Sequence, residues 1–146
     1  MVILSGEGAG LDRRVDAWVR VHKPAVALAE LPLLALERPL RLTANEDLPE
    51  LVEVIDSGRS KPALILVDTL SKFAGGLDEN SNADVAQYLG DLATALRDRF
   101  DSTVLLVAHA GHGDAKRPRG ASALMANPDA EYIVERSSPT AMTITV

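Results

Sequence analysis

The chain has 146 residues, of which 47% are hydrophobic, and a formal net charge of −6. This length suits one domain that buries roughly two-thirds of its unfolded surface, and the acidic balance argues against a protein whose whole surface binds nucleic acid. The chain has no cysteine, no apolar run of the roughly 20 residues that span a bilayer, and no signal-peptide pattern, so we expect a cytoplasmic protein without disulfides, thiolate metal sites or a membrane span.

The N-terminal elements are a short strand and a helix. The β-rich run at residues 1–5 predicts a strand, and the glycine-rich turn at residues 6–10 leaves Glu7 at the end of that strand. Residues 11–22 carry apolar side chains at helical spacing, with charged residues on the other face, which predicts an amphipathic helix. Trp18 belongs to the apolar stripe, so we expect it to be covered.

The next stretch is apolar and interrupted by prolines. It predicts edge strands at residues 26–29 or 40–42. Asn45 or Asp47 is the expected N-cap of a second helix, which ends near Gly58.

Two uninterrupted apolar runs define the centre of the predicted sheet. Residues 63–67 are too short for a buried helix and end on Asp68, so they predict a strand buried on both faces. Residues 103–108 repeat this pattern and are followed by His109. Between the two runs, residues 83–100 have the clearest helical periodicity in the chain.

The C-terminal part begins with a polar, basic surface loop at residues 111–120. A short helical turn is expected at residues 121–125. Two strands, at residues 131–135 and 141–146, are expected to form a hairpin. Together the elements predict an α/β fold with a mostly parallel sheet and a single domain over residues 1–146.

Five segments carry a family resemblance and occur in the family's order. The chain resembles the RepA-like branch of the RecA-fold, AAA-type ATPases, a branch that contains hexameric replicative helicases of plasmids and phages. The resemblance implies a three-layer RecA-like fold with helices on both faces of the sheet. The segments are Gly6-Glu-Gly-Ala-Gly10, Leu64-Ile-Leu-Val-Asp-Thr-Leu70, Asp78-Glu-Asn80, Leu105-Leu-Val-Ala-His109 and Arg119-Gly-Ala-Ser-Ala-Leu124.

The resemblance implies a role for each matching polar residue, with ATP and Mg²⁺ as cofactors. Asp68 would be the Walker B carboxylate that holds Mg²⁺ through water, with Thr69 beside it in the cofactor site. Glu7 would orient or deprotonate the attacking water, and His109 would sense the γ-phosphate. Arg119 would lie near the nucleotide, after the basic loop. These roles suit phosphoryl transfer, which needs a metal-holding acid, a water-positioning group and positive charge.

The chain also departs from the family pattern. Family members carry a P-loop strand and helix before the glycine-rich segment, whereas this chain begins at that segment and contains no Gly-Lys-Ser/Thr. We therefore expect poor ATP affinity and a P-loop strand missing from the sheet. That loss would leave an apolar edge beside the strand that precedes His109. A partner could fill the edge, the strands could close up, or two copies of the chain could pair through it.

Three functions remain open on the sequence. The first is a replicative helicase or ATPase-fold protein of phage or plasmid replication, with impaired or no ATP hydrolysis. The alternative is a non-catalytic interaction module that binds a replication protein or itself as a homo-oligomer. The third is binding of single-stranded DNA through Lys116, Arg117 and Arg119. A purely structural role is also open for the two carboxylates: Asp68 would end a buried strand and cap the next turn, and Glu7 would be an ordinary solvated residue.

Overall fold

The computed structural model describes the chain as two compact units, which are treated separately below. Unit 1 comprises Met1–Gly76 and Gly90–Ala108, and unit 2 comprises Leu77–Leu89 and His109–Val146. The described residues are 1–7, 10–23, 25–58, 60–110, 122–139 and 141–146.

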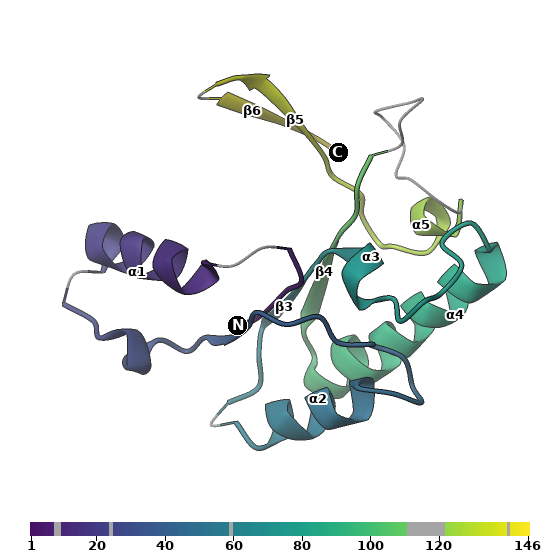
Figure 1. Ribbon diagram of the computed structural model, residues 1–146, viewed down its shortest axis with the longest axis horizontal. Coiled ribbons are helices and arrows are strands. Elements are labelled where there is room, and N and C mark those ends of the chain that lie inside the picture. The colour runs from purple at the N-terminus through teal and green to yellow at the C-terminus, as the bar shows by residue number, and fades with distance from the viewer. Residues whose placement is uncertain (8–9, 24, 59, 111–121, 140) are drawn as a thin grey trace. The chain divides into compact units, whose positions relative to one another are not determined.

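Unit 1 is built around a parallel four-stranded sheet (Figure 1). The predicted α/β, RecA-like fold class is confirmed, because helices flank this sheet. Each strand is apolar and short, as expected for strands inside a parallel sheet. In spatial order the strands are β2 (Leu34–Leu36), β1 (Val2–Ser5), β3 (Leu64–Asp68) and β4 (Thr103–Val107).

The strand order explains how the helices are divided between the two faces. The chain passes from β1 to β2 in one direction, and from β2 through β3 to β4 in the other. Right-handed crossovers therefore put α1 (Leu11–His22) on one face, and α2 (Leu48–Asp56) and η2 (Ala93–Asp98) on the opposite face. Accordingly, α1 and α2 lie on different sides of the strands in Figure 1, and η2 contacts both α2 and β4. The elements are α1 (Leu11–His22), η1 (Leu28–Glu30), α2 (Leu48–Asp56), α3 (Leu70–Phe73), α4 (Asn82–Leu92) and the π-helix η2 (Ala93–Asp98).

The two faces of the sheet are unequally covered. Ile65 and Val67 are fully buried on the face of α2 and η2. Leu66, on the other face, is only half-buried, and its neighbour Leu105 is 44% exposed. The expectation that β3 is buried on both faces is therefore only half right. The reason is that the directions of the crossovers place one helix, α1, on the second face.

The edge strand lies between the two positions predicted for it. Neither residues 26–29 nor residues 40–42 form a strand; the strand is Leu34–Leu36. Leu40 and Leu42 are instead buried core residues in a loop, and the Leu42 N–H donates to the carbonyl oxygen of Phe73 at 2.9 Å. Apolar composition suggested a strand there, but the side chains of Leu40 and Leu42 are buried without a strand partner.

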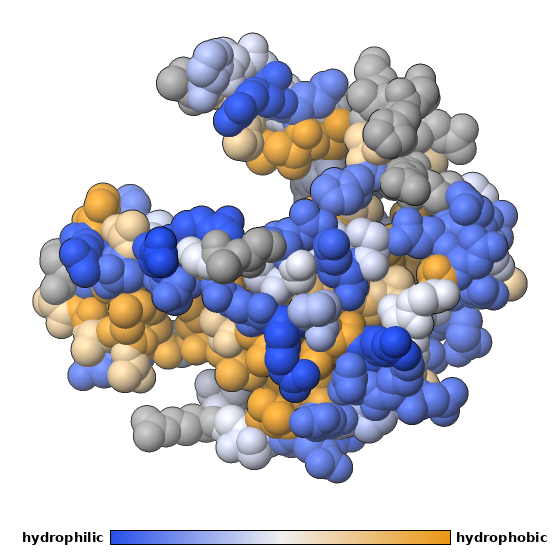
Figure 2. Space-filling view, viewed as in Figure 1, coloured by the Kyte–Doolittle hydropathy of each residue, from blue (hydrophilic) through white to orange (hydrophobic). Residues whose placement is uncertain are grey.

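Helix α1 has the predicted bounds but an open apolar face. Val19 is its one buried residue. Trp18 is 51% exposed and stacks against the ring of His22 with centroids 5.0 Å apart, so the expectation that it is covered is wrong. Figure 2 shows apolar surface mixed with hydrophilic surface over α1 and the segment after it. Val21 of α1 and Leu28 after it are exposed as well.

Unit 2 contains the first part of α4, the short helix α5 (Ala123–Ala126) and an antiparallel hairpin. The hairpin strands are β5 (Ile133–Ser138) and β6 (Ala141–Thr145), which confirms the predicted pair. Asn82 joins α4 to α5, because its side-chain oxygen accepts hydrogen bonds from Ser122 Oγ at 3.1 Å and from the Ala123 N–H at 3.0 Å. No described helix has both the length and the apolar character that a membrane crossing requires.

Tyr88 of unit 2 carries a buried hydroxyl that has no hydrogen-bond partner among the described residues. Burial raises the pKa of this phenol above its ordinary value. We predict that Tyr88→Phe leaves the free energy of unfolding unchanged or raises it by about 1 kcal/mol, because it removes an unsatisfied buried group. Because the pKa of Tyr88 is raised in the folded state, its phenol stays protonated there when the unfolded chain begins to ionise. The free energy of unfolding of the wild type is therefore fully retained at neutral pH and falls above about pH 10.

Urea unfolding at neutral pH and in alkali measures both effects. The stability advantage of Tyr88→Phe should grow in alkali. Tyr132→Phe is the matched control, since Tyr132 is 56% exposed. If Tyr88→Phe costs stability at neutral pH, the hydroxyl has a partner and the interpretation is wrong.

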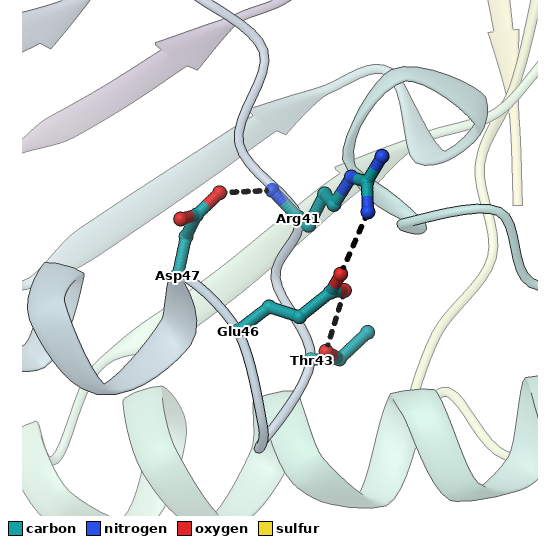
Figure 3. Close-up of polar contacts among 4 residues, drawn as sticks. All are labelled: Arg41, Thr43, Glu46 and Asp47. Carbon is teal, nitrogen blue, oxygen red and sulfur yellow. Dashed lines mark hydrogen bonds and ion pairs between the residues drawn. The ribbon is translucent and has the colours of Figure 1, made fainter.

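The loop before α2 is tied together by a polar cluster of four residues (Figure 3). Glu46 accepts hydrogen bonds from Arg41 Nη1 and Thr43 Oγ1, both at 2.9 Å, and Asp47 accepts one from the Arg41 N–H at 2.7 Å. The hydrogen bond from Arg41 lowers the pKa of Glu46, and the same bond raises the pKa of Arg41. The cluster is exposed, so its chief effect is to fix the shape of the loop.

Gly75 lies directly against this cluster, at a positive φ of 65°. A Cβ there would approach Glu46 Oε2 to 2.9 Å. We predict that Gly75→Ala lowers the free energy of unfolding by about 1–2 kcal/mol through backbone strain and adds a further loss through this contact. Gly76→Ala is the control, because Gly76 also has a positive φ but nothing within 4 Å of its Cβ position. Equal losses in urea unfolding would show that the contact is relieved without cost.

Candidate functional site

The carboxyl ends of β1 and β3 meet at one edge of the sheet in unit 1. Ser5 and Asp68 are partners in the parallel register, and both terminate their strands. The Gly6 N–H continues the ladder by donating to the Asp68 carbonyl oxygen at 2.6 Å. Glu7 therefore follows β1 at the same edge at which Asp68 ends β3, and this edge is where α/β folds bind ligands.

A hydrogen-bonded chain of side chains joins the two strand ends. Thr69 Oγ1 donates to Glu7 Oε1 at 3.1 Å and lies 3.2 Å from Ser71 Oγ. Because the Thr69 hydroxyl has one proton and gives it to Glu7, Ser71 must be the donor in the second bond. Thr69 is only 2% exposed, so the chain holds the Glu7 carboxylate from the protein side. The peptide bond between Asp68 and Thr69 is cis.

The Asp68 side chain is half-buried and makes no hydrogen bond or ion pair with any described residue. Carboxylate and hydroxyl oxygens are the donors that Mg²⁺ prefers, and they are the donors present here. The described residues contain no group of three acidic, histidine or cysteine side chains arranged to hold a metal. The site thus fits an ion that one carboxylate, Asp68, would hold through water, since Mg²⁺ usually keeps several of its water ligands.

Gly6 allows α3 to pack closely against this turn. A Cβ on Gly6 would lie 2.5 Å from Lys72 Cβ and 3.0 Å from Phe73 Cε2. Phe73 is fully buried, so it holds α3 in place against the end of β1. The first carbons of the Lys72 side chain therefore lie beside Gly6.

Ser71 and Lys72 were not among the residues singled out from the sequence. Their position depends on α3, a helix of only four residues that leaves no periodic signal. The signal that could have identified them is the run Asp-Thr-Leu-Ser-Lys at residues 68–72, where polar residues directly follow a buried strand.

The N-terminus of α1 is already occupied by a carboxylate. The N–H groups of Leu11 and Asp12 both donate to Glu37 Oε1, the latter at 3.2 Å. Helix N-termini after glycine-rich turns commonly bind phosphate. Here an acidic side chain satisfies those donors, so the start of α1 does not offer them to a phosphate group.

The structure does not test the remaining predicted site residues. His109 belongs to unit 2, whereas Glu7 and Asp68 belong to unit 1, so its role stays a prediction. Arg119 and the basic residues Lys116 and Arg117 lie outside the described residues.

A family model described as "AAA domain" matches residues 1–115. This family is one of the P-loop, RecA-like ATPases. Comparisons with curated proteins and with solved structures give no match. The matched range contains Glu7, Asp68 and Thr69, and with them the whole parallel sheet.

Proposed function

Because the chain belongs to the AAA domain family, we propose that it acts at a Mg²⁺–nucleotide site in DNA replication, as a relative of the RepA-like helicases of phages and plasmids. The observation that supports this proposal most strongly is the Thr69–Glu7 hydrogen bond at 3.1 Å. It ties Glu7, which follows β1, to the residue directly after Asp68, which ends the neighbouring strand β3. The order of the five family-like segments supports the assignment to replication.

Each side chain at this edge has a distinct task in the proposed site. Asp68 holds Mg²⁺ through water, and Mg²⁺ supplies charge neutralisation to the phosphates when bound. Glu7 accepts a hydrogen bond from the attacking water and aligns it. Thr69 and Ser71 keep the Glu7 carboxylate oriented, since each hydroxyl donates along the chain toward it.

The proposed site is least well supplied with the positive charge that would bind the phosphates. The sequence contains no Gly-Lys-Ser/Thr, so the backbone amides and lysine of a P-loop are not supplied by this pattern. Lys72, which starts beside Gly6, is the cation placed nearest to the acidic edge among the contacts described above. We therefore expect ATP affinity in the millimolar range and slow or absent hydrolysis.

Isothermal titration with ATP at millimolar concentration tests the proposed function. The expected result is weak binding that requires Mg²⁺ and is lost when EDTA removes the metal. A phosphate-release assay on the same sample then measures hydrolysis. If no heat is detected with Mg²⁺ present, the nucleotide-binding function is wrong, and a non-catalytic interaction module becomes the better interpretation.

A further inference from the structure

The carboxyl end of β2 carries an acidic residue at the same edge of unit 1 as the proposed site. β2 runs parallel to β1 with Leu36 opposite Leu4, and Glu37 is the residue directly after β2. Ser5, the next residue of β1, lies opposite Asp68 of β3. The three neighbouring strands therefore end at one level, and Glu37 follows the third of them.

Helix α1 begins without a cap of its own. Its N-cap residue is Gly10, which has a left-handed backbone at φ 104° and no side chain that could accept a hydrogen bond. The first N–H groups of a helix have no acceptor within the helix, so they need one from elsewhere. Glu37 Oε1 supplies it, because the N–H groups of Leu11 and Asp12 both donate to this oxygen. The cap of α1 thus comes from the end of a different element, 26 residues beyond Leu11.

The start of α1 restricts the position of Glu7, because only three residues separate Glu7 from Leu11. On the other side of Glu7, the Gly6 N–H donates to the carbonyl oxygen of the last residue of β3 at 2.6 Å. Thr69 Oγ1 holds the carboxylate itself at 3.1 Å. The turn that carries Glu7 is therefore held by β3 before Glu7 and by Glu37 after it.

We propose that Glu37 is a positioning residue for Glu7. By holding the start of α1 at the carboxyl end of β2, Glu37 keeps the Glu7 carboxylate within reach of Thr69 Oγ1. Its negative charge suits this place, because the N-terminus of a helix is partially positive and charge-assisted hydrogen bonds are roughly twice as strong as neutral ones. The catalytic task of Glu7 rests on the proposed function, whereas the link between Glu37 and Glu7 needs no nucleotide.

Carbon-13 NMR of the Glu7 carboxyl group tests this link on the whole chain without nucleotide, and Glu7→Gln identifies the signal. Thr69→Val removes the hydroxyl, so it gives the chemical shift of a Glu7 carboxylate that has lost its bond to Thr69. We expect Glu37→Ala to move the Glu7 signal toward this shift. Glu37→Gln should move it less, because the amide oxygen still accepts hydrogen bonds but carries no full charge.

Amide exchange on the same samples measures the cap itself. The amides of Leu11 and Asp12 should exchange about twofold to thirtyfold faster in Glu37→Ala, the factor that corresponds to the loss of one helix cap. Glu53→Ala is the matched control, because Glu53 is an exposed glutamate of α2. It should change neither the Glu7 signal nor the exchange of these two amides.

Two results would overturn the proposal. If the Glu7 signal keeps its wild-type shift in Glu37→Ala while the amides of Leu11 and Asp12 exchange faster, Glu37 caps α1 and does not position Glu7. If exchange of both amides is unchanged, Glu37 does not hold the start of α1. Thermal unfolding checks that the variants are folded, and Glu37→Gln is compared in the same way if Glu37→Ala is not.

Isothermal titration with Mg²⁺–ATP is scored separately from this link. A Glu7 signal that moves with Glu37→Ala, in a chain that shows no binding heat, would support the positioning role and contradict the proposed function. Binding heat together with an unmoved Glu7 signal would support the proposed function and overturn the positioning role.

Discussion

Asp68→Asn is expected to lower the affinity for Mg²⁺–ATP by about tenfold to a hundredfold, the loss that follows when one charge-assisted hydrogen bond to a metal-bound water is removed. The affinity for ATP without metal should stay constant or rise slightly, because one negative charge near the phosphates is lost. The free energy of unfolding should hardly change, since the Asp68 carboxylate bonds to no described residue. Titration with and without Mg²⁺ measures both affinities.

Asp98→Asn provides the matched control for this substitution. Asp98 also belongs to unit 1, and its exposed side chain pairs with the adjacent Arg97 at 2.8 Å, a surface contact that contributes little. The same loss of one charge there should leave Mg²⁺-dependent affinity unchanged. Equal effects of the two substitutions would mean that Asp68 acts through net charge alone, which contradicts its proposed role as a metal-holding residue.

Gly6→Ala is expected to lower the free energy of unfolding by about 1–3 kcal/mol, the usual cost of forcing an extra carbon into a packed site. The new Cβ would lie 2.5 Å from Lys72 Cβ, well inside the roughly 3.5 Å at which carbon atoms normally touch. Lys72 Cβ is fixed to the backbone of α3, and the neighbouring Phe73 is fully buried, so relief requires moving α3 or β1. Urea unfolding measures the loss.

The matched control is Gly90→Ala, because Gly90 lies in α4 and a Cβ there meets nothing within 4 Å. It should raise stability by up to about 1 kcal/mol, the usual gain from replacing glycine inside a helix. Gly6→Ala should in addition weaken Mg²⁺–ATP binding, because moving α3 separates Thr69 and Ser71 from Glu7. Wild-type stability for Gly6→Ala would show that α3 does not press against the strand end.

The central strands and the longer helices could be predicted from local pattern because that pattern is strong there. The apolar runs that form β3 and β4 are too short for buried helices, and residues 11–22 repeat apolar side chains at helical spacing. Residues 34–36 were missed as a strand because three residues among prolines carry almost no periodicity. The helix α3 was missed as well, because four residues are too few to show helical periodicity.

The meeting of Glu7 with Thr69 could be anticipated, because parallel neighbouring strands end at the same edge of a sheet. The close approach of Lys72 to Gly6 could not, since it depends on how α3 turns back after β3. The exposure of Trp18 and Leu105 was likewise beyond local pattern. An apolar side chain in a helix or strand is covered only if another element packs on that face, and neighbouring sequence does not contain that information.

Paramagnetic broadening by Mn²⁺ is the most direct test that the carboxyl ends of β1 and β3 hold a metal with its nucleotide. Mn²⁺ replaces Mg²⁺ at oxygen sites, and in the presence of ATP it broadens the NMR signals of nearby amides. The account predicts that the backbone amides of Glu7, Asp68 and Thr69 broaden first, and that Asp68→Asn abolishes the effect. Broadening confined to other parts of the chain, or none at saturating Mn²⁺ and ATP, would contradict it.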